Sequence, residues 1–240
     1  MPDDSIRLQK FIADTGIASR RQAEAMIEEG RLTINGIPAK LGSKVVPGKD
    51  RVHLDGGVIH ASKHVPVVLA LNKPKGLLCS NRDPHHSKTV FDLVPPSLNA
   101  GRLFCSGRLD KESEGLLILT NDGALSQKLT HPSHRVIKRY RVTIDRPLNP
   151  RHIKNLLEGI TWEGERLKVE KVIPEKSHDS TKLEVHLQHG KKREIRRLFI
   201  ALGYGVTRLI RFQIGKLTIR GIGPGKVKQL TNAEIELLFS

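Results

Sequence analysis

The chain has few of the residues that characterise exported or membrane-embedded proteins. Cysteine occurs twice in 240 residues, as Cys79 and Cys105, too few for a disulfide framework or a four-cysteine zinc site. One Trp and six Phe provide little aromatic surface, and no apolar run approaches the roughly 18 residues of a membrane-spanning helix. The N-terminus also lacks the basic and apolar segments of an export signal. We therefore expect reduced thiols and a cytoplasmic protein that does not engage a membrane.

Motifs for metals and cofactors are missing as well. The chain has eleven His, and His131 and His134 have no supporting carboxylates at the spacing of metal ligands. The glycines at 221, 223 and 225 form neither a phosphate-binding loop nor a dinucleotide fingerprint. We expect a protein that uses no metal and no cofactor.

Positive charge, in contrast, is abundant. Forty-one Lys and Arg outnumber twenty-five Asp and Glu, which gives a formal net charge of +16. Such an excess indicates a polyanionic partner, and nucleic acid is the first candidate. The polar segment at residues 60–66 has no periodicity and predicts a linker between two domains, at residues 1–62 and 67–240.

Residues 1–62 have the pattern of a small basic module. Leu8, Phe11 and Ile12 predict a short amphipathic helix, and Ser19 opens a second helix through a capping box with Gln22. Further along, Asn-Gly at 35–36 predicts a tight hairpin turn between short strands.

Basic side chains accompany both of these helices. They are Arg7, Lys10, Arg20, Arg21 and Arg31. They could form a solvated face or contact phosphates. The Arg20–Arg21 pair falls in the first turn of a helix, where the helix dipole disfavours cations, and contact with phosphates would offset that cost.

Residues 107–123 carry the most informative pattern. The stretch begins with Gly-Arg-Leu-Asp, and Gly115 then leads into the apolar run 116–119, which predicts a buried strand. Thr-Asn-Asp-Gly at 120–123 predicts the capped start of a helix over 124–129. Asp110 is therefore held on a loop by a rigid strand. An Asp between cations is typical of a solvated surface charge, but loops on rigid scaffolds also carry reactive groups.

Two later segments add candidates. Tyr140 lies among Lys138, Arg139 and other cations on a predicted strand, where its ring could be a core residue or a stacking surface for a base. The helix after residue 190 has an apolar stripe, and Arg196 lies at its flank, where a partly buried guanidinium needs a carboxylate. Lys192, Arg193 and Arg197 are left as candidates for phosphate contacts.

Together these segments resemble the RNA pseudouridine synthases, in the branch that modifies ribosomal RNA and carries an S4-like RNA-binding domain at its N-terminus. The likeness rests on Gly-Arg-Leu-Asp with Ser-Glu-Gly-Leu-Leu and Thr-Asn-Asp-Gly, on Lys-x-Tyr-x-Val at 138–142, and on Gly-Lys-Lys-Arg-Glu-Ile-Arg-Arg-Leu-Phe at 190–199. An Asn-Lys-Pro-x-Gly turn that contains Lys73 agrees with it. Residues 17–36 resemble the S4 module.

The resemblance implies specific roles for site residues. Asp110 would be the catalytic aspartate, Tyr140 would contact the target base, and Arg196 would pair with Asp110 and keep it ionised. Arg108 would fill the gap that a flipped base leaves. The other cations named above, Lys73 included, would contact RNA. Whether Asp110 attacks ribose or acts as a base stays open.

The resemblance also implies a fold and a function. We expect an α+β protein, with a small S4-like α/β module followed by a catalytic domain that has a mixed, mostly antiparallel sheet, flanking helices and a central basic cleft. It would isomerise one uridine in ribosomal RNA, or in a ribosomal precursor particle, as a monomer. Thr-Val-Phe-Asp at 89–92 favours the large-subunit (23S) RNA over the small-subunit (16S) RNA. The alternative from another class is a non-enzymatic ribosome-assembly factor.

Overall fold

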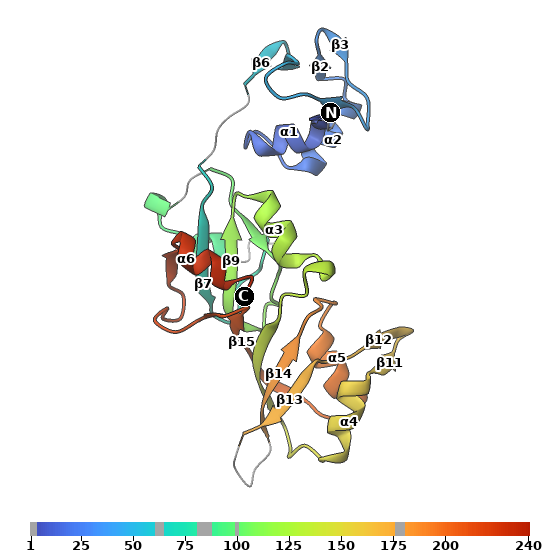
Figure 1. Cartoon of the computed structure of the whole chain (residues 1–240), viewed down its shortest axis with the longest axis vertical. Coiled ribbons are helices and arrows are strands. Elements are labelled where there is room, and N and C mark those ends of the chain that lie inside the picture. The colour runs from blue at the N-terminus through green and yellow to red at the C-terminus, as the bar shows by residue number, and fades with distance from the viewer. Residues whose placement is uncertain (1–3, 61–64, 81–87, 99–100, 176–180) are drawn as a thin grey trace. The chain divides into compact units, whose positions relative to one another are not determined.

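A computed structural model describes residues 4–60, 65–80, 88–98, 101–175 and 181–240. The chain divides into two compact units, Met1–Pro66 and Val67–Ser240 (Figure 1). Most of the predicted linker, residues 61–64, lies outside the described residues. Each unit has its own apolar core. None of the helices in the described ranges is long and apolar enough to cross a bilayer.

The first unit packs two helices against small sheets. The helices are α1 (Leu8–Asp14) and α2 (Arg20–Glu28). A four-stranded antiparallel sheet has the order β3 (Ile37–Pro38), β2 (Leu32–Ile34), β5 (Val52–Leu54) and β6 (Gly57–Ile59). A separate pair joins β1 (Ile6–Arg7) to β4 (Lys44–Val45).

Local sequence signals account for this unit. The hydroxyl of Ser19 accepts a hydrogen bond from the amide of Gln22, and the Gln22 side chain accepts one from the amide of Ser19, so the predicted capping box is confirmed. Asn35 and Gly36 both have positive φ, at 52° and 83°, as a tight turn between β2 and β3 requires. The predicted helical stripe is buried and forms the core with the strands.

The second unit is built on a nine-stranded sheet. Its main path has the order β13 (Lys171–Pro174), β14 (Lys182–Leu187), β10 (Lys138–Ile144), β15 (Val206–Ile214), β9 (Glu114–Thr120), β7 (Val68–Lys73) and β17 (Val227–Gln229). Off this path, β8 (Phe104–Ser106) pairs with β9, and β16 (Leu217–Thr218) pairs with β15. Among the described strand pairs of this sheet only β9–β15 is parallel, so the predicted mixed, mostly antiparallel sheet is confirmed.

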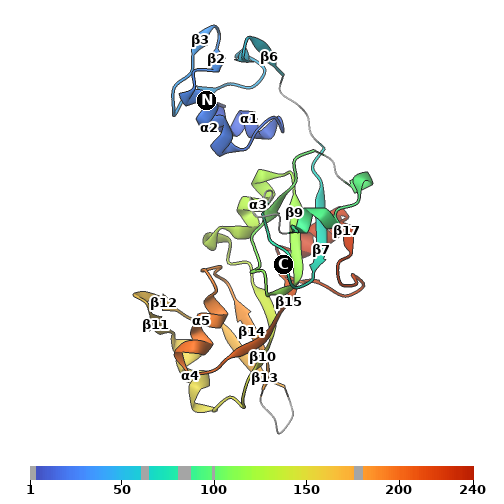
Figure 2. The same cartoon turned by 180° about the vertical axis from the view of Figure 1, so that it is seen from behind.

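Helices and a hairpin flank this sheet. The helices are α3 (Gly123–Thr130), α4 (Arg151–Glu158), α5 (Glu194–Ala201) and α6 (Asn232–Leu237). Short 3-10 turns cover Val90–Leu93, Pro96–Leu98 and Pro132–His134. The hairpin of β11 (Ile160–Trp162) and β12 (Glu165–Leu167) stands apart from the large sheet. Figures 1 and 2 show α3 and α6 near β7 and β9, and α4 and α5 near β13 and β14.

Strand β9 is the centre of the first half of this unit. Leu116 and Ile118 pack into the cluster that includes α3 and α6 residues, while Leu117 and Leu119 pack into a second cluster on the other face. Successive side chains of a strand point to opposite faces. Because both faces are covered, the run is apolar without alternation, as a doubly buried strand requires.

The second half is centred on β10 and β14, whose apolar face packs against α5. Ile195, Leu198 and Phe199 of α5 are all buried there, which confirms the predicted stripe. Polar and apolar residues alternate over 168–173 and predict a strand there, but the structure has β12 ending at Leu167 and β13 beginning at Lys171. Strand β15 pairs with β10 along nearly its full length and with β9 only at Ile210 and Arg211, so it joins the two halves.

Candidate active site

Asp110 lies on the loop that precedes β9, and the loop is fixed by hydrogen bonds to its backbone. The amide of Ser113 donates to the carbonyl of Asp110 at 3.0 Å, and the amide of Gly76 donates to the carbonyl of Lys111 at 2.9 Å. The thiol sulfur of Cys79 accepts a hydrogen bond from the amide of Leu109 at 3.4 Å. The aspartate is therefore presented by a loop that several neighbouring segments hold in place.

Lys73 supports the same loop from inside the protein. Its side chain is fully buried, and its ammonium donates to the carbonyls of Pro74, Asp110, Lys111 and Ser113 at 2.8–3.1 Å. Burial lowers the pKa of this ammonium, and nearby Cys79 and carboxylates partly oppose that effect. The prediction that Lys73 contacts RNA is wrong, because the ammonium is surrounded by these carbonyls and is closed to a phosphate.

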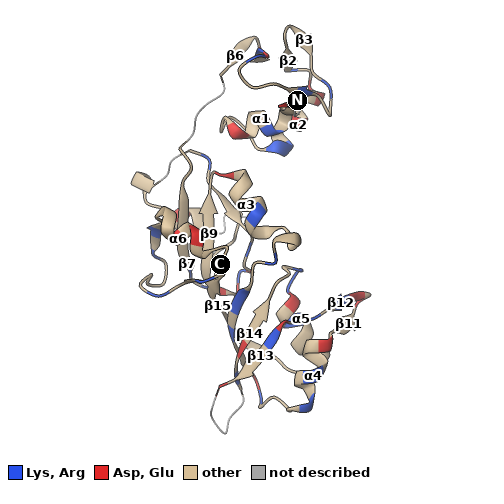
Figure 3. Ribbon diagram, in the orientation of Figure 1, with Lys and Arg blue, Asp and Glu red and all other residues tan. Residues whose placement is uncertain are grey.

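A cavity of about 580 Å³ opens beside Asp110. Arg108, Asp110, Lys138, Tyr140, Lys192 and Arg193 of the predicted site residues line it, together with Cys79, Lys111, Lys191, Glu194, Leu209 and Arg211 among others. Its lining is strongly basic, with Asp110 and Glu194 as the acids. This volume is in the range of small-ligand sites. Figure 3 shows Lys and Arg on β15 and the segments around it, consistent with the predicted basic cleft.

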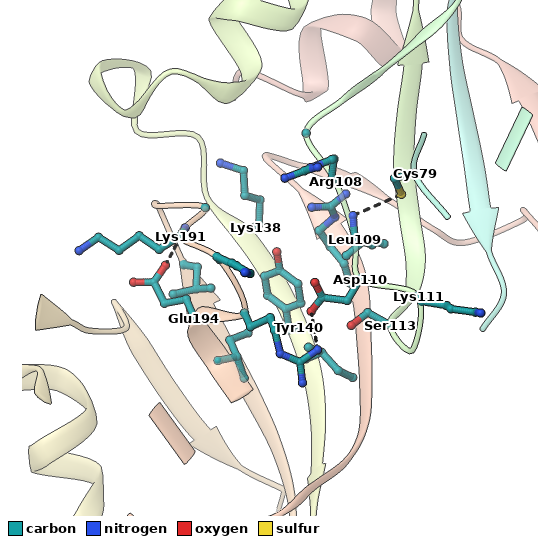
Figure 4. Close-up of a pocket in the computed structure, with 18 of the residues that line it drawn as sticks. Cys79, Arg108, Leu109, Asp110, Lys111, Ser113, Lys138, Tyr140, Lys191 and Glu194 are labelled. Atoms are coloured by element: carbon teal, nitrogen blue, oxygen red, sulfur yellow. Dashed lines mark hydrogen bonds and ion pairs between the residues drawn. The ribbon is translucent and has the colours of Figure 1, made fainter. Parts of the chain in front are cut away.

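Tyr140 forms one wall of the cavity. It belongs to β10, it is only 8% exposed, and Figure 4 shows its ring beside the carboxylate of Asp110. The hydroxyl end of the ring points toward the end of the cavity where Arg108 and Lys138 lie. The ring is thus a core residue that also forms a surface of the cavity, and its stacking on a base stays a prediction.

The cation that forms an ion pair with Asp110 differs from the expected one. The guanidinium of Arg193 lies 3.9 Å from the Asp110 carboxylate. Arg196 instead donates to the carbonyl of Val206 at 2.9 Å and, over a longer 3.5 Å, to the carbonyl of Glu112. Burial lowers the pKa of Arg196, as does the neighbouring Arg193, while Asp110 and Glu112 oppose these effects. Arg196 therefore lies close enough to act on Asp110 through its charge but binds the backbone of the loop.

The geometry of helix α5 explains this difference. Arg196 lies within the helix, so its side chain is directed along the helix flank toward β15. Arg193 is the N-cap residue, with a left-handed backbone at φ 52° and ψ 30°. Its side chain does not follow the helical repeat and reaches the cavity from the preceding loop.

In the second unit, two of the predicted RNA-facing arginines do not line the cavity. Arg197 binds Glu165 at 2.7 Å and Glu163 at 3.5 Å, and so ties α5 to the β11–β12 hairpin. Arg139 lies 3.9 Å from Glu184 on the neighbouring strand. Their guanidinium groups already have carboxylate partners, which makes them weaker candidates for phosphate contacts.

The basic residues of the first unit fall into two groups. Lys10 forms an ion pair with Asp14, Arg31 forms one with Asp55, and Arg7 donates to the carbonyl of Gly42. Arg20 and Arg21 are exposed in the first turn of α2 and have no ion pair among those described. Because their charges are uncompensated locally, this pair is the strongest candidate in the unit for phosphate contact.

Sequence reasoning missed several residues of the cavity wall. Arg211 is 4% exposed and lies in the middle of β15, and Glu194 is 3% exposed at the start of α5. Burial raises the pKa of Glu194, while the amide of Lys191, which donates to its carboxylate at 3.3 Å, opposes this. The available signal for Arg211 was a charged residue between two apolar neighbours, Ile210 and Phe212, on a strand.

Comparison with known proteins gives the site its family. A family model described as RNA pseudouridylate synthase matches residues 67–201, which is more than half of the chain. The chain belongs to this family. A second family model, the S4 domain, matches residues 6–52 in the first unit. The predicted order of an S4-like module and a pseudouridine-synthase domain is therefore confirmed.

Relatives and a solved structure agree with the assignment. The chain is 37% identical over 243 residues to the dual-specificity RNA pseudouridine synthase RluF of Escherichia coli (strain K12), covering 100% of this chain and 80% of that protein. It is 35% identical to an "uncharacterized RNA pseudouridine synthase" of Aquifex aeolicus (strain VF5), covering 98% and 94%. A crystal structure of a pseudouridylate synthase matches with a TM-score of 0.70 and 32% identity over 97% of this chain and 99% of that chain. The protein is an RNA pseudouridine synthase and hence an isomerase, which decides against the non-enzymatic alternative.

Proposed function

We propose that this enzyme isomerises a specific uridine of ribosomal RNA, in the large-subunit (23S) RNA, and that Asp110 is its catalytic residue. One observation carries the second part: the Asp110 carboxylate lies beside the Tyr140 ring in a basic cavity, on a loop whose backbone Lys73 holds from within. The large-subunit target rests on the resemblance of residues 89–92 to enzymes that act on that RNA. The net charge of +16 supports a nucleic-acid substrate. We expect the enzyme to meet this substrate in the cytoplasm.

The site's chemistry follows from the reaction. Uridine isomerisation breaks the bond between C1′ of ribose and N1 of uracil, turns the base, and joins C5 to C1′. C5 loses a proton and N1 gains one, so no atoms are gained or lost overall. The target base must leave its stack to reach the cavity, at a cost of a few kcal/mol. Tyr140 offers a face for the extruded base, and the exposed Arg108 can fill the space left in the RNA.

Asp110 would act at the sugar, as a nucleophile toward C1′ or as a base. Arg193 and Arg196 would orient it, the first by its ion pair with the carboxylate and the second by its hydrogen bond to the backbone of the loop. The first unit, residues 1–62 in our domain assignment, would add affinity through Arg20 and Arg21 and leave the chemistry to residues 67–240. Specificity would come from RNA shape and unpaired bases. The basic surface residues Lys192 and Arg193 would meet the RNA backbone at the cavity mouth.

The test maps pseudouridine in cells that produce wild-type protein or the Asp110→Asn variant. Carbodiimide adducts and primer extension should reveal a stop in 23S RNA that is present with wild type and lost with Asp110→Asn. Glu112→Gln is a matched control, because it removes an exposed carboxylate two residues away that does not line the cavity. A stop that appears only in 16S RNA or in transfer RNA would correct the substrate. If the pseudouridine pattern of these RNAs is the same with Asp110→Asn as with wild type, the proposed role of Asp110 is wrong.

A further inference from the structure

Arg211 is a buried cation whose hydrogen-bonding capacity is only partly used within the described structure. Its Nε donates to the carbonyl of Leu116 at 2.7 Å, but its Nη2 is buried without a hydrogen-bond partner. No carboxylate among the described residues forms an ion pair with it. An uncompensated buried charge is strongly destabilising. A buried cation of this kind in the wall of a cavity indicates that a ligand supplies the missing hydrogen-bond partner.

The position of Arg211 directs it toward the same cavity as Tyr140. The two residues are opposite each other in the antiparallel β10–β15 pair, so their side chains lie on the same face of the sheet. Both line the cavity. A base stacked on Tyr140 would therefore bring the rest of its nucleotide close to Arg211.

Lys138 adds a second cation beside Arg211. Its ammonium donates to the carbonyls of Val136 and Gln188 at 3.1 and 3.2 Å, and no described carboxylate forms an ion pair with it. Burial and the like charge of Arg211 lower the pKa of Lys138 to about 8, while Glu194 opposes this effect. Two cations held this close repel each other until an anion binds between them.

The neighbouring acids of the protein offset these charges only in part. The charge of Glu194 acts on Lys138, but its carboxylate accepts a hydrogen bond from the amide of Lys191 and forms no described ion pair with either cation. The hydrogen bond with Cys105 lowers the pKa of Cys79 to about 6, and Arg211 contributes to this, so the Cys79 thiolate offsets part of the charge of Arg211. A uracil carbonyl could accept a hydrogen bond here but would add no negative charge. A phosphate has the charge and the acceptor oxygens for both groups.

We propose that Arg211 and Lys138 form a subsite for a phosphate that flanks the target uridine. This inference rests on the proposed function, since it places the uridine against Tyr140. The subsite holds the nucleotide by its backbone, at a point remote from the bond that breaks. Arg211 and Lys138 are then positioning residues, which fix the ribose relative to Asp110.

The experiment couples a change in the RNA to a change in the protein. Short RNA substrates carry a neutral methylphosphonate in place of the phosphate on the 5′ side or on the 3′ side of the target uridine. Each is compared with unmodified RNA for wild type, Arg211→Gln and Lys138→Gln, by equilibrium Kd and by kcat/KM. Lys154→Gln, which changes an exposed Lys of α4 outside the cavity, is the control for net charge. Thermal unfolding of each variant is measured, and Lys138→Gln serves alone if Arg211→Gln does not fold.

We expect the methylphosphonate and the cavity substitution to disrupt the same contact, so that their effects on Kd are not additive. One of the two methylphosphonates should weaken wild-type binding by ~10- to 100-fold, as for a charge-assisted hydrogen bond. The same methylphosphonate should weaken binding by Arg211→Gln or Lys138→Gln by a smaller factor than it weakens wild-type binding, because one of the two cations that contact the phosphate is already gone, while Lys154→Gln should behave as wild type.

Two results would overturn the subsite. One is that neither methylphosphonate weakens wild-type binding; the other is that the loss is equal in wild type and in both cavity variants. The Kd measurement does not depend on turnover. If wild type binds the RNA but makes no pseudouridine in it, the proposed substrate fails, and the coupling in Kd still decides the subsite.

Discussion

Arg193 and Arg196 reach the loop of Asp110 in different ways, and this predicts different effects of their removal. Arg193 forms an exposed ion pair at 3.9 Å, which contributes between 0 and about 1 kcal/mol. Arg193→Gln should therefore lower kcat by less than ~5-fold. Arg196 is half-buried and donates to the carbonyls of Val206 and Glu112. Arg196→Gln should lower kcat by ~10- to 100-fold.

Single-turnover rates at saturating RNA measure this difference, with Glu112→Gln as the control for a surface charge. A larger loss of kcat in Arg193→Gln than in Arg196→Gln would contradict this prediction. It would show that the ion pair of Arg193, and not the hydrogen bonds of Arg196 to the loop backbone, positions Asp110.

Lys138 predicts a pH dependence of RNA binding. Its pKa is lowered from 10.5 to about 8, first by burial and then by Arg211, with Glu194 acting in the opposite direction. The charged form is half populated near pH 8 and is lost as the pH rises through that value. RNA affinity should therefore decrease above pH 8 in wild type. Lys138→Arg should reduce this decrease, because a guanidinium stays charged. Filter-binding Kd values from pH 6.5 to pH 9.5 measure it, and equal decreases in both proteins would contradict it.

The lowered pKa of Lys138 has the opposite consequence for the stability of the folded protein. A lowered pKa means that the unfolded chain binds more protons than the folded chain between pH 8 and pH 10.5. The contribution of Lys138 to the free energy of unfolding therefore rises with pH across this window. Between pH 8 and pH 10.5, the free energy of unfolding of wild type relative to Lys138→Gln should therefore increase. Over the same range, the RNA affinity of wild type relative to Lys138→Gln should decrease.

Among the secondary-structure elements, the β9–β15 pair depends on a single glycine. Gly115 has φ +108°, and a Cβ there would lie 2.2 Å from the carbonyl oxygen of Arg211. Gly115→Ala should destabilise the protein by about 2–4 kcal/mol, since it combines backbone strain with a clash against main chain. Gly221 also has a positive φ, +81°, but has no atom near the added Cβ. Gly221→Ala should cost only about 1 kcal/mol. Urea unfolding compares the two, and equal losses would mean that β15 can move away from β9.

The elements that the sequence predicted are those with strong local signals. The apolar run of β9, the stripe of α5 and the capping box at Ser19 each depend on residues within one or two turns of chain. The β11–β12 hairpin gave no such signal, because each of its strands is only three residues long.

Side chains that depend on tertiary contacts could not be predicted in this way. Lys73 and Arg211 look like surface cations in the sequence, yet both are buried against carbonyls from segments about 40 and 95 residues away. The choice between Arg193 and Arg196 depends on the left-handed backbone of Arg193, which no helical periodicity reveals. The motif around Asp110 indicated the cavity that we propose as the active site, but the arrangement of the charges around it depends on tertiary contacts.

For the whole molecule, the net charge of +16 implies RNA binding that weakens as salt increases. Each phosphate contact adds about 0.7 to the slope of log Kd against log salt for single-stranded RNA. Arg20 and Arg21 are exposed and lack described ion pairs, so Arg20→Gln with Arg21→Gln should reduce this slope by about 1.4 and leave kcat at saturating RNA unchanged. Lys49→Gln, an exposed cation of the same unit, should leave the slope nearly unchanged. If the double variant keeps the wild-type slope, the first unit binds RNA through another surface; if it lowers kcat, that unit also helps to place the uridine at Asp110.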